Sequence, residues 1–220
     1  MYKIKNYIIK LIWKLTSNTS KHGFRELNIP NIIIDEVLKE FGKIEKDDLI
    51  LDAGCGGGFL CNSLAKLSYK VVGIDYVLKF NKNYNGSFII CDIKHLPFKS
   101  SIFDKIICYS VLQYIGPKEN ILKVLKEFYR ILKSGKKIFI GEIVTQKGYF
   151  NDHLISSDIP IIRKILLFFY LNIVYQYYFY PRDEWISMFN ELNFKYHFVQ
   201  QDTRMPYHKN MVHCLLEKNE

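Results

Sequence analysis

The stretch LDAGCGGGFL, residues 51–60, is the part of the sequence that most strongly indicates the fold. It places four glycines and one acidic residue directly after the apolar run 49–51. Glycine is costly to order, so a backbone this bare indicates a turn that passes close to another group. In parallel α/β sheets, ligands bind beyond the carboxyl ends of the strands, and the loop after a first buried strand is the place to look for a site.

Short β-branched runs alternate with helical periods around this stretch. Helices are predicted at 59–67, at 119–135 with Gly135 in the helix-ending position, and at 181–193. Strands are predicted at 49–54, 69–76, 87–93, 103–111, 136–144, 195–203 and 210–218. This pattern predicts an α/β fold: a doubly wound, seven-stranded, mostly parallel sheet whose last two strands form an antiparallel edge hairpin. Residues 146–180 are aromatic and poor in charge, which predicts a helical lid insertion.

Composition narrows the class of protein. A chain of 220 residues with 49% hydrophobic residues can bury one sizeable core. The net charge of +9 arises mostly in 49–145, which holds 14 basic and 7 acidic residues, and the basic ones are almost all single lysines without a run of four. This favours a solvated basic surface over a nucleic-acid footprint.

Cysteine usage and hydropathy bear on the compartment. The five cysteines form no CxxC pair and have no metal-ligand spacing with the six histidines, so we expect a reduced, cytoplasmic protein without a metal. The apolar stretch 159–180 is interrupted by Arg163 and Lys164, and its uninterrupted apolar core, residues 165–171, is too short to span a membrane. Residues 1–15 form a basic amphipathic pattern, which fits either a helical cover on the protein's own body or binding to a membrane surface.

The glycine spacing separates two kinds of ligand. A dinucleotide fingerprint, GxGxxG, needs a third small residue for close packing of helix on sheet, and Phe59 occupies that position. The sequence instead has Asp52 followed by GxGxG at Gly54, Gly56 and Gly58. This resembles motif I of the class I S-adenosylmethionine-dependent methyltransferases. Bare glycines let the backbone pass beneath a ligand, and the following helix turn offers N–H groups to a carboxylate.

Three further features follow in the order that the resemblance implies. Asp75 closes the second strand, where a carboxylate can accept from both ribose hydroxyls, and Asp92 after the third can accept from the adenine amine, with Ile93 against the ring. The stretch 103–140 and the preceding DxxxLPF step are similar to the methyltransferase type 11-like group that acts on small molecules. Gln113 stands where many members of that group carry histidine.

The resemblance implies S-adenosyl-L-methionine as the cofactor. We expect one domain in four parts: an N-terminal helical cover 1–48, a donor-binding core 49–145, the lid 146–180 and the rest of the sheet 181–220. The expected cofactor-binding residues are Asp52, Gly54, Cys55, Gly56, Gly58, Asp75, Tyr76, Asp92, Ile93, Tyr109 and Ser110.

Methyl transfer from a sulfonium is an in-line displacement, so positioning the acceptor supplies much of the catalysis and a base is optional. His153, in a polar patch at the start of the lid, is the first candidate base, and His208 is the second. The expected substrate-binding residues are Tyr114, Tyr149, Arg182 and Tyr207.

The expected acceptor is an oxygen of a small anionic metabolite, phosphorylated or nucleotide-linked, or of a sugar. The N-terminal helix and the aromatic insertion could support a homodimer. The alternatives are an RNA methyltransferase, disfavoured by the dispersed lysines, a non-catalytic donor-binding subunit, and an NAD-linked oxidoreductase, disfavoured by Phe59.

Overall fold

The strands that the structure describes form one seven-stranded sheet in the order β3-β2-β1-β4-β5-β7-β6. The computed structural model describes residues 29–76, 86–145, 161, 180–205, 208–209 and 211–220. The strands are β1 (Leu49–Ala53), β2 (Lys70–Asp75), β3 (Ser87–Ile90), β4 (Phe103–Tyr109), β5 (Leu132–Val144), β6 (Phe194–Gln200) and β7 (Met211–Lys218). The first five pair in parallel, whereas β7 runs antiparallel to both β5 and β6. The predicted doubly wound sheet with an antiparallel edge hairpin is confirmed.

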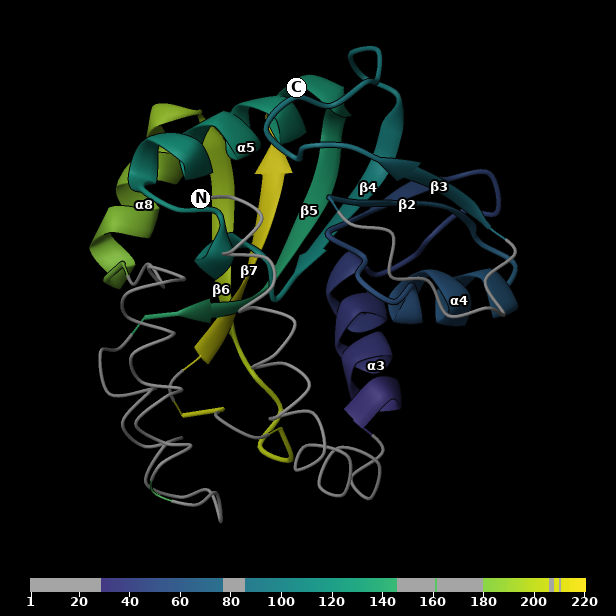
Figure 1. Ribbon diagram of the computed structural model, residues 1–220, viewed down its shortest axis with the longest axis horizontal. Helices are drawn as coiled ribbons and strands as arrows, with labels where there is room; N and C mark the ends of the chain where they lie inside the picture. The colour runs from purple at the N-terminus through teal and green to yellow at the C-terminus, as the bar shows by residue number, and fades with distance from the viewer. Residues whose placement is uncertain (1–28, 77–85, 146–160, 162–179, 206–207, 210) are drawn as a thin grey trace.

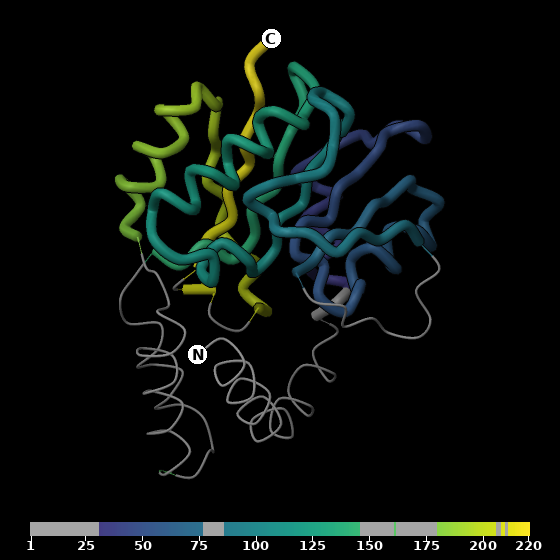
Figure 2. Tube along the Cα trace, turned by 45° about the horizontal axis from the view of Figure 1, so that its top comes forward, coloured from purple at the N-terminus to yellow at the C-terminus, as the bar shows by residue number. Residues whose placement is uncertain are grey.

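Helices cover both faces of this sheet (Figures 1 and 2). One face packs against α3 (Ile29–Phe41) and α4 (Phe59–Lys66), and the other against α5 (Lys118–Ile131) and α8 (Arg182–Glu191). The apolar side chains of α5 recur at helical spacing and are fully buried, as Leu125 and Phe128 show. Strands covered on both faces are buried along most of their length, as the run Ile106, Ile107 and Cys108 of β4 shows.

The order of the strands reverses between β1 and β4. From β1 the chain builds outward to β2 and β3, and it then returns to build β4 and β5 on the other side. Such a reversal leaves a crevice at the carboxyl ends of the central strands, because the two connections leave in opposite directions. The glycine-rich loop follows β1 at this point.

The end of α5 differs from the prediction. The helix ends at Ile131, and Leu132 is already extended and pairs with Phe103 of β4, so Gly135 lies in β5 with φ +66° and does not end the helix. Pairing with β4 outweighs the local stop signal that glycine provides.

Several predicted segments lie outside the described residues. They are 1–28 of the N-terminal cover and, except for 161 and 180, the whole lid 146–180. Among the helices of the described ranges, none is long and apolar enough to cross a membrane.

Candidate functional site

A cleft of about 540 Å³ opens at the point where the strand order reverses. Its walls come from the loops that follow β1, β2, β3 and β4. The lining residues are Gly54, Gly56, Ile74, Asp75, Tyr76, Cys91, Asp92, Ile93, Lys94, Ser110, Val111, Tyr114 and Ile115. Seven of the expected cofactor-binding residues therefore meet in one cleft, although they are spread over more than fifty positions of the sequence.

The glycine loop is fixed to the neighbouring strand by its backbone. Gly54 N and Cys55 N both donate to the carbonyl oxygen of Ile74 in β2, at 2.8 and 2.9 Å. Gly54 has φ +81°, and a Cβ atom there would overlap the side chain of Val111. The loop can approach the segment after β4 this closely only because Gly54 has no side chain.

Asp75 connects the second strand to this loop. Its Oδ2 accepts from the backbone N–H of Gly56 at 2.9 Å. A Cβ atom added at Gly56 would meet nothing within 4 Å, so the backbone borders open space. Beside Asp75 in the cleft wall lies Tyr76, which is 58% exposed. The acidic end of β2 thus lies directly against the glycine loop.

Asp92 lies in the turn after β3. Its Oδ1 accepts from the backbone N–H of Lys94 at 2.9 Å, and its Oδ2 lies 3.3 Å from Lys94 Nζ. Ile93, which lies between Asp92 and Lys94 in the sequence, also lines the cleft. Asp92 therefore both shapes its own turn and presents a carboxylate to the cleft.

Four of the expected cofactor-binding residues lie behind the cleft rather than in its wall. Asp52 is buried in β1, where its Oδ2 accepts from the Cys61 thiol at 3.1 Å, and burial raises the pKa of this carboxyl to about 6. Gly58 begins α4 in a left-handed conformation. Cys55 is buried, and so is most of Tyr109, whose hydroxyl donates to Glu142.

Phe59 does not occupy the packing position between helix and sheet that the dinucleotide fingerprint assigns to a small residue. It is the first residue of α4 and is 39% exposed. The close approach occurs at Gly73 of β2, where a Cβ atom would collide with the sulfurs of Cys61 and Cys55 at 2.8 and 3.0 Å.

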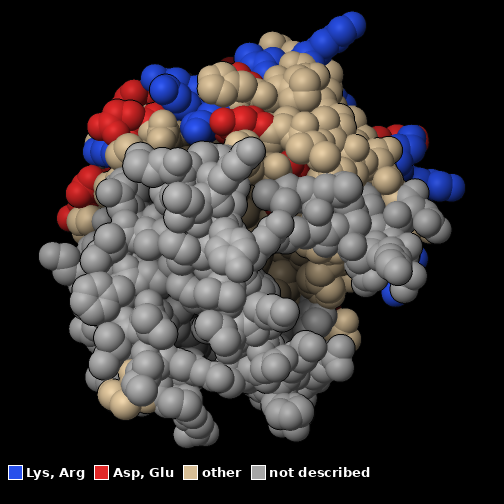
Figure 3. Space-filling model, in the orientation of Figure 1, with Lys and Arg blue, Asp and Glu red and all other residues tan. Residues whose placement is uncertain are grey.

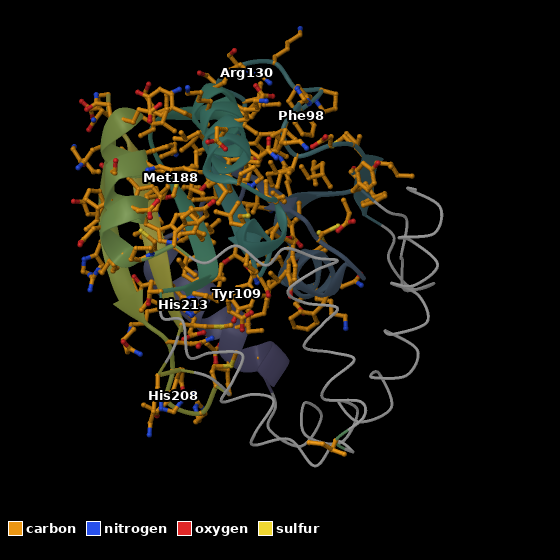
Figure 4. All side chains as sticks on the ribbon, turned by 60° about the vertical axis from the view of Figure 1, so that its left-hand side comes forward. Phe98, Tyr109, Arg130, Met188, His208 and His213 are labelled. Atoms are coloured by element: carbon orange, nitrogen blue, oxygen red, sulfur yellow. The ribbon has the colours of Figure 1, made fainter. Side chains whose placement is uncertain are left out.

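The expected catalytic and substrate-binding residues are dispersed. Tyr114 lines the cleft and is 48% exposed, whereas Arg182 stacks over the Phe198 ring, 4.2 Å from its centroid. His208 is bonded through Nδ1 to the Met205 carbonyl and lies apart from Tyr109 (Figure 4). The other three candidates lie outside the described residues: Tyr149, His153 and Tyr207.

A polar cluster beside the cleft was not predicted from the sequence. Glu142 Oε1 accepts from the Tyr109 hydroxyl at 3.3 Å and from Gln201 Nε2 at 3.5 Å. Its backbone N–H donates to His213 Nδ1 at 3.1 Å, and the Tyr109 and His213 rings lie side by side in Figure 4, 5.8 Å apart. The available signal was a single carboxylate within the apolar run 138–144.

Comparison with known proteins agrees with this geometry. Residues 51–140 match the family described as "Methyltransferase domain". An uncharacterised protein of Methanocaldococcus jannaschii is 35% identical over 140 residues, which are 61% of this chain and 58% of that protein. The mitochondrial ubiquinone biosynthesis O-methyltransferase of Rattus norvegicus is 28% identical over 63% of this chain and 44% of its own length.

The fold is also shared with solved structures. The plantazolicin methyltransferase BpumL, in complex with a pentazolic desmethylPZN analog and SAH, superposes with a TM-score of 0.67 over 100% of this chain and 99% of its own, at 18% identity. The core therefore has the fold of a class I methyltransferase, and the predicted resemblance to the type 11-like group is confirmed. The family match covers residues 51–140, and the chain spans 58% and 44% of the lengths of the two curated relatives.

Proposed function

We propose that the chain is an S-adenosylmethionine-dependent methyltransferase that acts on a small molecule. The observation that carries this proposal is that the glycine loop, Asp75 and Asp92 line one cleft. They follow one another as the methionine, ribose and adenine parts of the donor would. A volume of about 540 Å³ is that of a small-molecule site. The family match over residues 51–140 supports the same donor.

Each part of the donor has a partner in the cleft. The open backbone at Gly56 leaves room for the methionine end, Asp75 can accept from ribose hydroxyls, and Asp92 from the adenine amine beside Ile93. When bound, the donor supplies an activated methyl group. The protein then has to hold the acceptor oxygen about 3 Å from the methyl carbon, aligned and shielded from water.

For the acceptor we propose an oxygen of a small metabolite, with phosphorylated and nucleotide-linked sugars as the first class to test. Lys94 adds positive charge to the cleft wall, where it pairs with Asp92 at 3.3 Å. Two other cations in the described part are engaged elsewhere: Arg182 lies on Phe198, and Arg204 forms a bidentate pair with Asp202.

The charge distribution argues against an RNA substrate. Over the described residues visible in Figure 3, basic and acidic side chains are interspersed and form no continuous basic surface. Several lysines are paired with carboxylates, as Lys133 and Lys136 are with Asp104. A cytoplasmic location and a homodimer stay predictions of the sequence.

Labelled methyl transfer tests this function. The full chain is incubated with methyl-labelled S-adenosylmethionine and metabolite extracts separated into anionic and neutral fractions, and products are identified by mass spectrometry. We expect label in a small molecule, with none in added RNA. Label in RNA alone would replace this proposal with the nucleic-acid alternative, and no transfer despite tight donor binding would favour a non-catalytic donor-binding subunit.

A further inference from the structure

Glu142 occupies an irregular place in the sheet. The register of β5 against β7 shifts between Ile140 and Ile143, and Glu142 has φ +58°. A left-handed backbone is strained for a residue that has a side chain. Bulges of this kind re-aim side chains and are frequent next to active sites. Here the bulge directs the Glu142 carboxylate to side chains at the end of β4 instead of leaving it in the regular ladder.

Ser110 connects this carboxylate to the cleft. Ser110 lines the cleft wall, on the side opposite to Asp75 and Asp92 in the strand order. Its Oγ accepts from Gln113 Nε2 at 2.9 Å, so the Ser110 hydroxyl proton is not used in that bond, and Ser110 lowers the pKa of the Glu142 carboxyl. One hydroxyl group therefore lies between a ligand in the cleft and a carboxylate behind it.

The surroundings of Glu142 suit a proton acceptor. Burial raises the pKa of this carboxyl above its ordinary value, while Ser110, His213, Tyr109 and Gln201 act in the opposite direction. His213 Nδ1 accepts from the backbone N–H of Glu142, and its Nε2 lies 3.2 Å from Glu36 of α3. A carboxylate whose pKa is raised toward the working pH is a better base than an exposed one.

Gln201 can serve both protonation states of Glu142. Its side chain is 1% exposed, and its Nε2 donates to the carboxylate while its Oε1 has no hydrogen-bond partner among the described residues. A buried carbonyl oxygen without a donor is costly. When Glu142 carries a proton, rotation of the amide lets Oε1 accept it.

We propose that Glu142 receives the proton of the methyl acceptor through Ser110, so that the methylated atom is a hydroxyl oxygen and not an oxygen that is already anionic. The inference rests on the proposed function and specifies its acceptor. The acceptor oxygen forms the new bond to the methyl carbon, and the carbon–sulfur bond breaks with its electron pair remaining on sulfur. The hydroxyl proton passes to Ser110, which transfers its own to Glu142, and Glu142 later returns a proton to solvent.

Glu142→Gln tests this role, with Glu217→Gln as the matched control on the neighbouring strand β7. Glu217 pairs with Lys195 at the surface, so its loss removes a carboxylate without touching the cluster. We expect Glu142→Gln to lower labelled methyl transfer by roughly 10²–10⁴-fold. The affinity for S-adenosylhomocysteine, measured by calorimetry, stays within about threefold of wild type, because the role lies in proton transfer.

The pKa of Glu142 provides a second readout that does not need an acceptor. In ¹³C NMR of protein labelled at glutamate carboxyl carbons, Tyr109→Phe removes a donor to the carboxylate and shifts the Glu142 titration to higher pH. The acidic limb of the rate profile should move with it. Wild-type rates in Glu142→Gln, or a product methylated on a phosphate or carboxylate oxygen, would overturn this inference alone. Absence of transfer by the wild type would overturn the proposed function with it.

Discussion

Gly54 and Gly56 stand two positions apart in the glycine loop, yet an added methyl group would meet different surroundings. At Gly54 it overlaps Val111 on a left-handed backbone, whereas at Gly56 it meets nothing within 4 Å. We expect Gly54→Ala to lower the free energy of unfolding by about 2–4 kcal/mol, from overpacking plus strain, and Gly56→Ala by about 1–2 kcal/mol from strain alone. Urea unfolding of both variants checks this order, and equal losses would show that the contact with Val111 is unimportant.

The side chain of Asp75 is expected to bind the donor. Its Oδ2 holds Gly56 N, so Asp75→Asn alters both the loop and the expected ribose contact. We expect the affinity for S-adenosylhomocysteine to fall about tenfold or more, which corresponds to at least ~1.4 kcal/mol. Asp47→Asn is the control, because Asp47 forms only an exposed pair with Lys70 at the start of the same strand. Unchanged affinity in Asp75→Asn would remove this carboxylate from the binding site.

Among the elements, the loop between β3 and β4 depends on one side chain of α5. Arg130 donates to the carbonyl oxygens of Phe98 and Leu96 at 2.7 and 3.1 Å, and it pairs with Glu127, which accepts from Leu96 N. These bonds hold the backbone of the Leu-Pro-Phe segment, residues 96–98, against α5. In Figure 4, Arg130 and Phe98 lie at the end of the sheet away from Tyr109.

We expect Arg130→Lys to lower the free energy of unfolding by about 1–3 kcal/mol, because a lysine cannot reach two carbonyl groups and a carboxylate together. Lys126 lies on the same helix as Arg130 and forms an exposed pair with Glu191 of α8, so Lys126→Ala should change the free energy of unfolding by less than about 1 kcal/mol. Thermal unfolding of the two variants measures both. A tolerant Arg130→Lys would show that the LPF loop is held by the packing of Phe98 on Phe103.

The elements also show what the sequence could and could not reveal. The positions of the strands and helices follow from apolar periodicity, and Asp75 and Asp92 could be predicted because the carboxyl ends of neighbouring parallel strands lie at the same edge of the sheet. The polar cluster around Glu142 could not be predicted, because it depends on a bulge in which a glutamate takes the left-handed conformation that sequence rules assign to glycine. The end of α5 was misplaced because pairing of Leu132 with Phe103 is a long-range contact.

For the whole molecule, the buried Asp52 links stability to pH. Burial raises the pKa of its carboxyl from 3.8 to about 6, so the folded state binds more protons than the unfolded chain between these values. The contribution of Asp52 to stability is therefore present below pH 4 and is lost as pH rises to about 6.

Replacement by asparagine removes this dependence while keeping the shape. We expect the free energy of unfolding of Asp52→Asn, relative to wild type, to increase by on the order of 2 kcal/mol between pH 4 and pH 7. Chemical unfolding at a series of pH values measures the difference. A difference that is constant with pH would mean that Asp52 has an ordinary pKa.

The central claim is that the cleft at the strand reversal binds S-adenosylmethionine. Calorimetric titration of the full chain with S-adenosylhomocysteine, and separately with NAD, tests it most directly. We predict one S-adenosylhomocysteine per chain, weakened by Asp75→Asn and unaffected by Asp47→Asn, and no heat from NAD. Binding of NAD with no binding of S-adenosylhomocysteine would contradict the account.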